Sequence, residues 1–318
     1  MERGVIERAL ETTFYGFSTD DVPSGAEMTV GKVRDIFDLG GELLIVTSDR
    51  ISAFDRVLTT IPFKGQVLNG MSNYWFGAMK DVLPNHIKKK LTSRAVVVSR
   101  CDVLPIEVVV RGYLTGSAWR DYQSSGAVSG IELPDGMRFN QRFEKPLLTP
   151  STKAERGDHD EPISTREIVD RGLVEADLWS EVETKAFELF GLGTKLAAER
   201  GLILVDTKYE FGLLGGNLVL VDEVHTPDSS RYWFSDSYEK LFEAGEKQRK
   251  LDKEYLRQWL MEEQDYMGDG PPPTIPSEIR VNVAEKYIQS YELVTGANFA
   301  VDQANAESER NTILSYLS

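Results

Sequence analysis

The side chains best suited to chemistry alternate along one predicted strand. In the stretch GLILVDTKYEFGLLGGNLVLVDEV, residues 201–224, Asp206, Lys208 and Glu210 occupy alternate positions. Successive side chains of a strand point to opposite faces, so these three project from the same face. Carboxylates set among Leu, Val and Ile repel one another and lose hydration unless a cation balances them. Lys208 could supply one positive charge, and a bound Mg²⁺ would balance the rest, because hard divalent ions take carboxylate and phosphate oxygens.

A second strand is expected to return the chain past this row. Gly215, Gly216 and Asn217 stand between two apolar runs, which is typical of a β-hairpin. The second run ends in Asp222 and Glu223, which would point to opposite faces. The sequence does not fix the pairing register, but either register brings one of these carboxylates near the alternating row. The alternative is a solvated hairpin face with an ordinary Lys–Glu cross-strand pair.

The residues around the hairpin favour a binding site over a solvated face. Asp228, Ser230 and Arg231 follow Pro227 and place turn-forming hydroxyls and a guanidinium beside the acidic row. A second guanidinium, Arg111, leaves the apolar run IEVVV and meets the small-residue loop GYLTGS, which exposes the hydroxyl of Ser117. The planar fork of Arg suits phosphate or carboxylate. This mixture fits an anionic ligand bridged to a metal.

The elements that must position these groups begin with a predicted antiparallel meander. MTVGKVRDIFDLGGELLIVTS, residues 28–48, contains apolar runs separated by tight turns. In the first turn, the backbone N–H groups of Gly31 and Lys32 could approach phosphates while the lysine adds a charge. A plain turn is the commoner meaning of Gly-Lys. The stretch is not a Walker A loop, because Val33 stands where Ser or Thr is required.

Two β-branched runs, AVVVSRC and IEVVV, follow within residues 94–110 and are split by Asp102–Pro105. A kinked, apolar connection of this kind is where nucleotide-binding folds of the kinase type read an adenine edge. A buried strand pair with a bulge fits the same pattern equally well.

Helical patterns are expected at 67–80, 164–172, 177–200, 236–264 with a break near Gly245, and 277–295, with a short helix at the end of the chain.

The polar stretch KPLLTPSTKAERGDHDEPIS, residues 145–164, has little periodicity and carries Lys153, His159 and Asp160. A loop this polar usually faces water, so on its own it is no evidence for a site.

Composition sets limits on the class of protein. The chain has 318 residues, 41% of them apolar and 27% charged, which is ordinary for a soluble globular protein. Its formal net charge is −15, which makes a nucleic acid or an anionic membrane an unsuitable partner. One cysteine, Cys101, excludes an intramolecular disulfide and suits a reducing compartment. The charged N-terminus lacks a signal-peptide core, so a cytoplasmic location is expected.

The elements group into an α+β fold with two lobes. Residues 1–107 are expected to form an N-terminal lobe of antiparallel strands that carries the Gly31–Lys32 turn. Residues 108–318 are expected to form a larger α+β lobe around the central hairpin, with the C-terminal helices packed outside it. This is the arrangement of a two-lobed, kinase-like or ATP-grasp-like nucleotide-binding fold.

Seven strings, taken together, resemble the phosphoribosylaminoimidazole-succinocarboxamide synthase (SAICAR synthetase) family of purine biosynthesis. They are GKVRDIFD, SDRISAFD, IPFKGQVLN, VVVRGYLTGSAW, TPSTKAERGDHDEPIS, GLILVDTKYEFG and VDEVHTPDSSRYW, in the family's order. The resemblance covers residues from about 28 to 260. Each string alone is weak, but the set in register is specific. Local departures such as Ala118 and His225 are expected to be tolerated substitutions.

The resemblance implies an ATP-dependent ligase. ATP, carboxyaminoimidazole ribonucleotide (CAIR) and L-aspartate would give the succinocarboxamide SAICAR, ADP and phosphate. A carboxylate is a poor electrophile, so transfer of the γ-phosphoryl group would first form an acyl phosphate, from which the aspartate amine displaces phosphate. Positioning and charge neutralisation by Mg²⁺ and cationic side chains would supply most of the catalysis.

The resemblance also implies roles for individual residues. Lys208 and Asp206 would flank the reacting carboxylate, and Glu210 and Asp222 would hold Mg²⁺, with Glu223 as a second choice for the metal. The nucleotide would be bound by Gly31, Lys32, Val33, Arg34, Arg100, Asp102, Val103, Lys153 and Asp160. The ribonucleotide would be bound by Arg111, Ser117, Asp228, Ser230, Arg231 and Arg257. Ser52 and Asp55 are candidates for the L-aspartate pocket.

Two other functions remain compatible with parts of the sequence. A small-molecule kinase with a related two-lobed ATP site would stop at phosphorylation and form no amide. A silent nucleotide-binding or scaffold protein would be expected to lack a metal carboxylate or a phosphate-binding lysine. Glu210, Asp222, Lys32 and Lys153 are all present, and the PDSSR and VRGYLTGS strings favour the ligase.

Overall fold

The structure is a computed structural model, and it describes residues 1–23, 26–54, 56–153, 161–251, 254–301 and 306–318. The chain divides into two compact units. The first comprises Met1–Tyr74, His86–Arg100 and Asp252–Ser318, and the second comprises Trp75–Asn85 and Cys101–Leu251. Within the described residues, none of the helices combines the length and apolar character that a membrane crossing requires.

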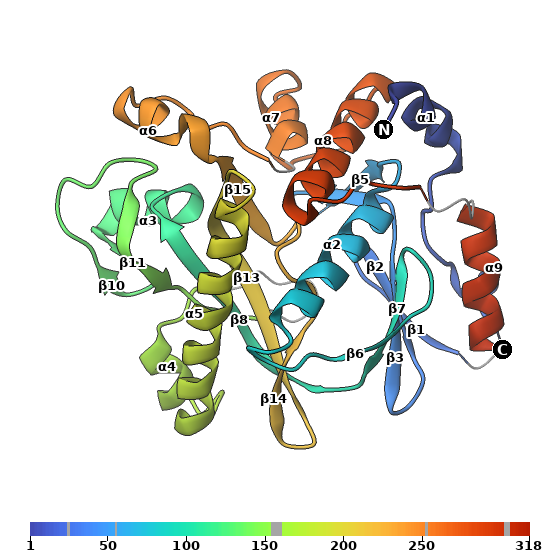
Figure 1. The fold of residues 1–318 in the computed structure, drawn as a ribbon, viewed down its shortest axis with the longest axis horizontal. Coiled ribbons are helices and arrows are strands. Elements are labelled where there is room, and N and C mark those ends of the chain that lie inside the picture. Colours follow the sequence, from blue (N-terminus) through green and yellow to red (C-terminus); the bar gives the residue numbers. More distant parts are fainter. Residues whose placement is uncertain (24–25, 55, 154–160, 252–253, 302–305) are drawn as a thin grey trace. The chain divides into compact units, whose positions relative to one another are not determined.

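The first unit is built on a five-stranded antiparallel sheet in the order β1-β2-β3-β7-β6 (Figure 1). Its strands are β1 (Glu27–Val30), β2 (Arg34–Asp38), β3 (Glu42–Thr47), β6 (Ile87–Lys90) and β7 (Ala95–Ser99). β1 to β3 form the predicted meander. A separate hairpin pairs β4 (Arg50–Ala53) with β5 (Arg56–Thr60).

The helices of the first unit come from the N-terminal part of the chain and from its C-terminal segment. They are α1 (Arg3–Arg8), the first part of α2 (Lys64–Met79), α7 (Glu254–Glu262), α8 (Ser277–Thr295) and α9 (Ala306–Leu317), with short 3₁₀ turns at Ala9–Thr12 and Thr19–Asp21. One face of the sheet buries Phe37, Leu44 and Val46 against Phe14 and Ile313. Because Ile313 belongs to α9, the end of the chain is part of this core.

This grouping differs from the expected boundary at residue 107. Residues 252–318, expected with the second lobe, make their contacts within the first unit. The reason is long-range packing, because α9 places Ile313 in the sheet's core and α8 contacts α1. No local pattern in the sequence encodes either contact.

The second unit is built on a six-stranded sheet around β13 (Leu202–Leu214). β13 pairs antiparallel with β8 (Asp102–Tyr113), β14 (Asn217–Val221) and β15 (Ser230–Phe234). β11 (Arg142–Leu148) and β12 (Ser151–Thr152) pair with β8, and β9 (Ala127–Val128) pairs with β10 (Ile131–Glu132). The turn between β13 and β14 is formed by Gly215 and Gly216, both at positive φ, as the hairpin prediction requires.

The helices of this unit are α3 (Gly116–Ser125), α4 (Thr165–Asp170), α5 (Ala176–Ala198) and α6 (Ser235–Glu243). α5 runs along β13, as Figure 1 shows, and buries Val182, Ala186 and Leu189. A Cβ on Gly112 would stand 3.4 Å from the Phe190 ring of α5. Gly112 and Arg111 point to opposite faces of β8, so α5 covers the face opposite Arg111.

Candidate active site

The alternating row of β13 lies on one face of the second unit's sheet, together with charged residues from both neighbouring strands. Asp206 is the register partner of Arg111 on β8 and of Arg231 on β15. Glu210 is the register partner of Glu107 on β8. Residues directly opposite in an antiparallel pair point to the same face. The sheet therefore presents a guanidinium-rich end at Asp206 and a carboxylate-rich end at Glu210, with Lys208 between them.

Lys208 is held by two carboxylates. Its ammonium donates to Glu107 Oε1 at 2.5 Å and to Glu210 Oε1 at 2.8 Å. Burial alone would lower the pKa of Lys208, but the carboxylates of Glu210, Asp222 and Glu107 outweigh it and raise the pKa above its usual range. Lys208 is therefore a fixed positive charge at neutral pH. Lys153 forms a second ion pair with the other oxygen of Glu210.

The structure distinguishes between the two carboxylates at the end of β14. Asp222, at φ 66°, contributes directly to the raised pKa of Lys208, so its carboxylate belongs to the Glu210 end of the row. Glu223 instead accepts a hydrogen bond from the Thr226 hydroxyl at 2.5 Å. The register of β13 and β14, which the sequence left open, is thus the one that pairs Glu210 with Val221, next to Asp222.

The Glu210 end offers hard oxygen donors, which suit Mg²⁺ better than a transition metal. Among the residues that the structure describes, no group of three or more His, Cys, Asp or Glu side chains is arranged to hold a metal ion. Two carboxylates completed by phosphate oxygens and water are the usual protein contribution to a Mg²⁺ site. Glu210 and Asp222 fit that contribution.

The other end of the row is a cluster of guanidinium and hydroxyl groups. Arg111 donates to Asp206 at 3.3 Å, to the Thr149 hydroxyl at 2.9 Å and to the Ser117 hydroxyl at 3.2 Å. Arg231 donates to the same Asp206 oxygen at 2.5 Å. Burial is the main reason that the pKa of Arg111 is lowered, and Asp206 opposes the shift. One carboxylate thus orients two guanidinium groups.

A glycine allows the two guanidinium groups to approach the loop before α3. Gly116 has φ 60°, and a Cβ there would stand 2.6 Å from a terminal nitrogen of Arg231. The LTGS segment, residues 114–117, therefore lies close to Arg231 as well as to Arg111.

Two of the residues expected to bind the ribonucleotide, Ser230 and Asp228, lie outside the guanidinium cluster. Ser230 pairs with Thr207, and its hydroxyl lies 2.7 Å from that of Thr207, on the opposite face of the sheet from Asp206. Asp228 lies in a turn in which its N–H donates to Thr226 Oγ1 at 3.2 Å. Lys208 N–H donates to the Ser229 carbonyl at 3.0 Å, so the PDSSR turn is tied directly to the row.

His225 is a buried group for which the sequence predicted no role. It lies 2.6 Å from the Tyr209 hydroxyl through Nε2, and its ring stacks edge-on against Trp75 with centroids 4.7 Å apart. Burial lowers the pKa of His225 to about 3, so the imidazole is neutral. Tyr209 occupies the strand position between Lys208 and Glu210 and points to the opposite face, which was the available signal.

The Gly31–Lys32 turn of the first unit is anchored from behind. Arg50 Nε donates to the Lys32 carbonyl and Arg50 Nη2 to the Gly31 carbonyl, both at 3.1 Å. Ser48 donates to the Val33 carbonyl through its N–H at 2.9 Å and its hydroxyl at 2.8 Å. Arg50 itself is buried and paired with Asp35 at 2.7 Å. The sequence predicted neither role, although Ser48 and Arg50 belong to the SDRISAFD string.

The anchoring pattern sets the direction of the turn's N–H groups. In a trans peptide the C=O and the following N–H point in opposite directions. The N–H groups of Lys32 and Val33 are therefore directed away from Arg50. Lys32 is exposed, and Arg34 begins β2.

The same sheet carries an open cavity of about 480 Å³ on its other face. Its lining includes Thr29, Ile36, Leu43 and Arg100. Ile36 and Leu43 pack there against a cluster of Ile45, Val96 and Val98. An aliphatic floor with polar groups around it suits an aromatic heterocycle. Arg100 forms an ion pair with Asp38 at this rim.

The remaining expected residues are placed as follows. Asp102 and Val103 begin β8 opposite Leu213 and Gly212, and Val103 is exposed. Arg257 lies on α7 with its guanidinium 5.0 Å from the Phe54 ring centre, in the first unit. Ser52 lies on β4. Asp160 and Asp55 lie outside the described residues.

Comparison with known proteins gives a consistent family. The family model for SAICAR synthetase matches residues 27–273. A phosphoribosylaminoimidazole-succinocarboxamide synthase from Legionella pneumophila is 46% identical over 278 residues, which are 86% of this chain and 88% of the relative. The corresponding synthase from Bacteroides thetaiotaomicron is 44% identical over 317 residues, which are 98% of this chain and 99% of the relative.

Solved structures agree with the sequence relatives. The SAICAR synthase from Saccharomyces cerevisiae complexed with SAICAR has a TM-score of 0.79 and 34% identity, covering 91% of this chain and 99% of that chain. A SAICAR synthetase in complex with ADP has a TM-score of 0.66 at 23% identity and shares the fold. The matched span contains the alternating row, the guanidinium cluster and the Gly31–Lys32 turn. The chain therefore belongs to the SAICAR synthetase family.

Proposed function

We propose that this chain joins L-aspartate to the carboxylate of CAIR at the expense of ATP, using the charged row of β13 to activate that carboxylate. The observation that carries the proposal is the row itself. It places a permanently charged Lys208 between a carboxylate-rich end at Glu210 and a guanidinium-rich end at Asp206.

The first unit supplies the nucleotide contacts in this proposal. Adenine lies on the aliphatic floor of the 480 Å³ cavity, with Arg100 at its rim. The triphosphate meets the outward N–H groups of the Gly31–Lys32–Val33 turn, where Lys32 and Arg34 add charge. Asp102, Val103, Lys153 and Asp160 are proposed as nucleotide contacts from the family resemblance.

The second unit supplies the CAIR contacts. Arg111 and Arg231, oriented by Asp206, bind the phosphate and carboxylate of the ribonucleotide, and Ser117 donates from the loop before α3. Ser230, whose hydroxyl bonds Thr207, acts through the backbone of β15, and Asp228 shapes the adjoining turn. Arg257 is a further candidate.

Chemistry then proceeds in two steps. A carboxylate oxygen of CAIR attacks the γ-phosphorus of ATP, which forms an acyl phosphate and releases ADP. The amine of L-aspartate attacks the acyl carbon, loses a proton, and displaces phosphate to form the amide. Mg²⁺, held by Glu210 and Asp222, would neutralise phosphate charge when bound. Lys208 stabilises the charge on the oxygens being transferred, and Asp206 keeps the two guanidinium groups in place.

The acidic composition fits this proposal. With a net charge of −15 and one cysteine, the chain suits small anionic substrates held by local cations, acting in the cytoplasm, and does not suit nucleic acid or membrane surfaces.

The test is an ADP-release assay with CAIR and L-aspartate omitted in turn. The proposal predicts that steady ADP release requires both substrates. Steady release with CAIR alone, accompanied by a stable phosphorylated product, would instead identify a kinase. Release with neither substrate would identify an ATPase and overturn the proposal.

A further inference from the structure

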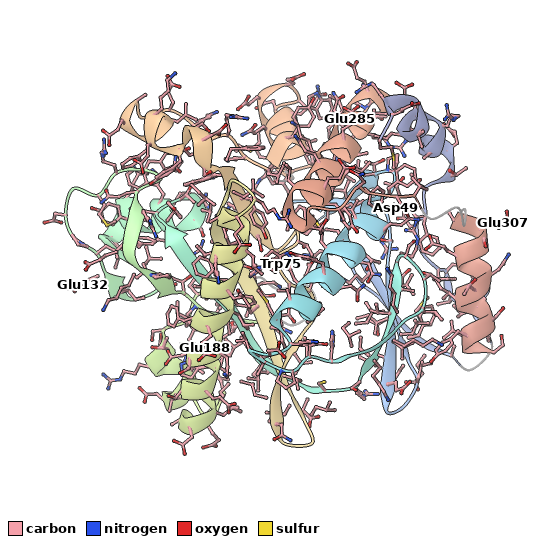
Figure 2. The ribbon with its side chains drawn as sticks, in the orientation of Figure 1. Asp49, Trp75, Glu132, Glu188, Glu285 and Glu307 are labelled. Atoms are coloured by element: carbon pink, nitrogen blue, oxygen red, sulfur yellow. The ribbon has the colours of Figure 1, made fainter. Side chains whose placement is uncertain are left out.

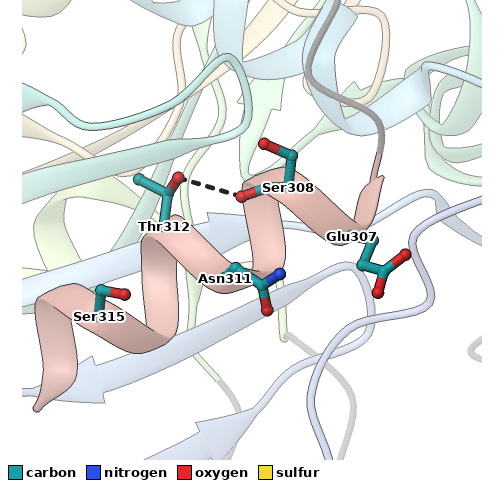
Figure 3. Close-up of a pocket in the computed structure, with 5 residues that line it drawn as sticks. All are labelled: Glu307, Ser308, Asn311, Thr312 and Ser315. Atoms are coloured by element: carbon teal, nitrogen blue, oxygen red, sulfur yellow. Dashed lines mark hydrogen bonds between the residues drawn. The ribbon is translucent and has the colours of Figure 1, made fainter.

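The last helix of the chain has two different faces. Glu307, Ser308, Asn311, Thr312 and Ser315 lie along the outward face of α9 and line a shallow depression (Figure 3). In that view Thr312 donates to the Ser308 carbonyl of the helix itself. The inward face carries Ile313, in the sheet core, and Glu309, which is 1% exposed. A buried carboxylate at the end of a chain calls for a physical account.

Glu309 is fully satisfied by three side chains of the first unit. Arg94 Nε donates to it at 2.6 Å, Gln66 Nε2 donates at 3.1 Å, and the Ser93 hydroxyl also donates to it. Burial alone would raise the pKa of Glu309, but Arg94 and these hydrogen bonds hold it below its usual range. Glu309 is therefore an anion, and Arg94 is its counterion.

Arg94 connects Glu309 to the segment that anchors the Gly31–Lys32 turn. Its Nη1 donates to Asp49 at 3.1 Å and to the Thr47 carbonyl at 3.3 Å. Asp49 also accepts from the N–H groups of Gly65 at 2.9 Å and Phe14 at 2.8 Å. A Cβ on Gly65 would stand 2.7 Å from Arg94 Nη1, so the backbone is fitted closely around this guanidinium.

Asp49 lies between the two residues that hold the turn. Ser48 binds the Val33 carbonyl, and Arg50 binds the carbonyls of Gly31 and Lys32. Ser48 and Arg50 are fixed through one another as well, because the Arg50 N–H lies 3.3 Å from Ser48 Oγ. A continuous chain of polar contacts, buried at Arg94 and Asp49 and part-buried at the turn, therefore runs from α9 to the Gly31–Lys32 turn.

We propose that Glu309 is a positioning residue for the nucleotide-phosphate turn, acting through Arg94 and the Ser48–Asp49–Arg50 segment. The proposal rests on the proposed function, which assigns the ATP phosphates to that turn. Glu309 lies outside the span 27–273 that matches the family model. The helix that carries it thus adds to the nucleotide site from the face of the sheet opposite the cavity.

The electrostatics explain why a remote carboxylate has this effect. Arg94 is 2% exposed and carries a charge that burial penalises, while Asp49 and Glu309 together raise its pKa. Without Glu309, Arg94 keeps Asp49 as its one charged partner among the contacts described here. A guanidinium that shifts towards Asp49 or towards solvent disturbs the peptide planes of 47–49, and the turn loses its fixed anchor.

The main test uses Glu309→Gln, which preserves shape and removes the charge. We expect the KM for ATP to rise about tenfold while kcat and the KM for CAIR change less than about twofold, as a coupling of ordinary size would give. In the unliganded protein, hydrogen exchange should accelerate at the amides of Gly31 and Ser48, which donate to the Arg34 and Val33 carbonyls. If Glu309→Gln folds poorly, Glu309→Asp is the second variant. It keeps the charge on a shorter side chain, and it should show smaller effects in the same direction.

Two control variants separate positioning from general loss of stability. Glu307→Gln changes an exposed carboxylate of the same helix and should behave as the wild type. Ile313→Ala loosens the packing of α9 but leaves every charge of the network in place. If Ile313→Ala raised the KM for ATP as much as Glu309→Gln at an equal fall in Tm, or if Glu309→Gln left exchange at Gly31 and Ser48 unchanged, the proposal would be overturned.

A Lys32→Ala variant keeps the two proposals distinguishable. If it leaves the KM for ATP unchanged, the charge of Lys32 does not contribute to phosphate binding and the proposed function loses that nucleotide contact. The exchange measurement on Glu309→Gln needs no ATP, so it reports on the coupling in either case.

Discussion

At the scale of single residues, charge fixed by neighbours is the common feature of the site. Lys208 stays protonated because the carboxylates of Glu210, Asp222 and Glu107 offset the effect of its burial. Arg111 and Arg231 share the carboxylate of Asp206. Such groups need no reorganisation when charge develops on the substrate, which is the main source of electrostatic catalysis.

The first prediction concerns Lys208. Lys208→Ala should reduce kcat by at least about a thousandfold, since the proposed mechanism uses the charge of Lys208 to stabilise the oxygens being transferred. The fold should persist, because Lys153 still pairs with Glu210. Turnover by coupled ADP release and unfolding by circular dichroism would measure both effects. Lys185→Ala, which removes a surface ion pair with Glu188, is the control, and near-normal activity of Lys208→Ala would refute the assigned role.

The second prediction concerns the buried His225. The unfolded imidazole binds a proton near pH 6.5, whereas the folded one does so only near pH 3, so the unfolded state binds more protons between these values. Stability must therefore fall as pH falls through this window, by up to about 1.4 kcal/mol per pH unit. The test compares the His225→Leu, Tyr209→Phe double variant with Tyr209→Phe alone. The free energy of unfolding, measured by urea denaturation, should depend less steeply on pH in the double variant, by the equivalent of one bound proton. Equal slopes would show that His225 titrates normally.

At the scale of elements, the hairpin could be predicted from sequence and its fine structure could not. Alternation along 202–214 and the Gly215–Gly216 turn fixed which side chains of β13 share a face. The partners were not encoded locally, because Arg111 and Glu107 reach β13 by pairing of strands that are far apart in the chain. Helices α5 and α8 follow their apolar patterns closely. The long pattern at 236–264 divides into α6 and α7, and the predicted break near Gly245 is confirmed, because Gly245 has φ 67°.

The third prediction tests the fit of the loop before α3. Gly116→Ala puts a methyl group 2.6 Å from Arg231 and should raise the KM for CAIR about tenfold by displacing that guanidinium. Gly126→Ala is a matched control, because Gly126 has φ 72° at the end of the same helix with open space around its Cβ position. Both variants should lose about 1 kcal/mol of stability from backbone strain. An equal rise in the KM for CAIR in both would exclude a specific role for the Arg231 contact.

At the scale of the whole chain, exposed carboxylates contribute to the negative charge, while Arg111, Lys153, Lys208 and Arg231 are paired with carboxylates of the candidate site. Glu132, Glu188 and Glu307, which are labelled in Figure 2, are exposed. Asp49, labelled in the same view, is buried and paired with Arg94. Interactions such as Arg94 with Glu309 join residues 215 positions apart, so composition and periodicity could not reveal them.

The fourth prediction concerns the metal. ADP with Mg²⁺ should raise Tm, because a ligand at about 100 times its Kd stabilises the folded state by about 2.7 kcal/mol. EDTA should abolish most of this shift, and Asp222→Asn should reduce the shift to that seen with EDTA. Thermal melts with and without the chelator measure both. If the rise in Tm persisted in the Asp222→Asn variant with EDTA present, nucleotide binding would not depend on a metal held by Glu210 and Asp222.

The most direct test follows oxygen from CAIR into phosphate. CAIR labelled with ¹⁸O in its carboxylate is turned over with ATP and L-aspartate, and the phosphate is analysed by mass spectrometry or ³¹P NMR. Activation of the carboxylate as an acyl phosphate predicts one labelled oxygen in each phosphate released. Unlabelled phosphate formed together with SAICAR would contradict it.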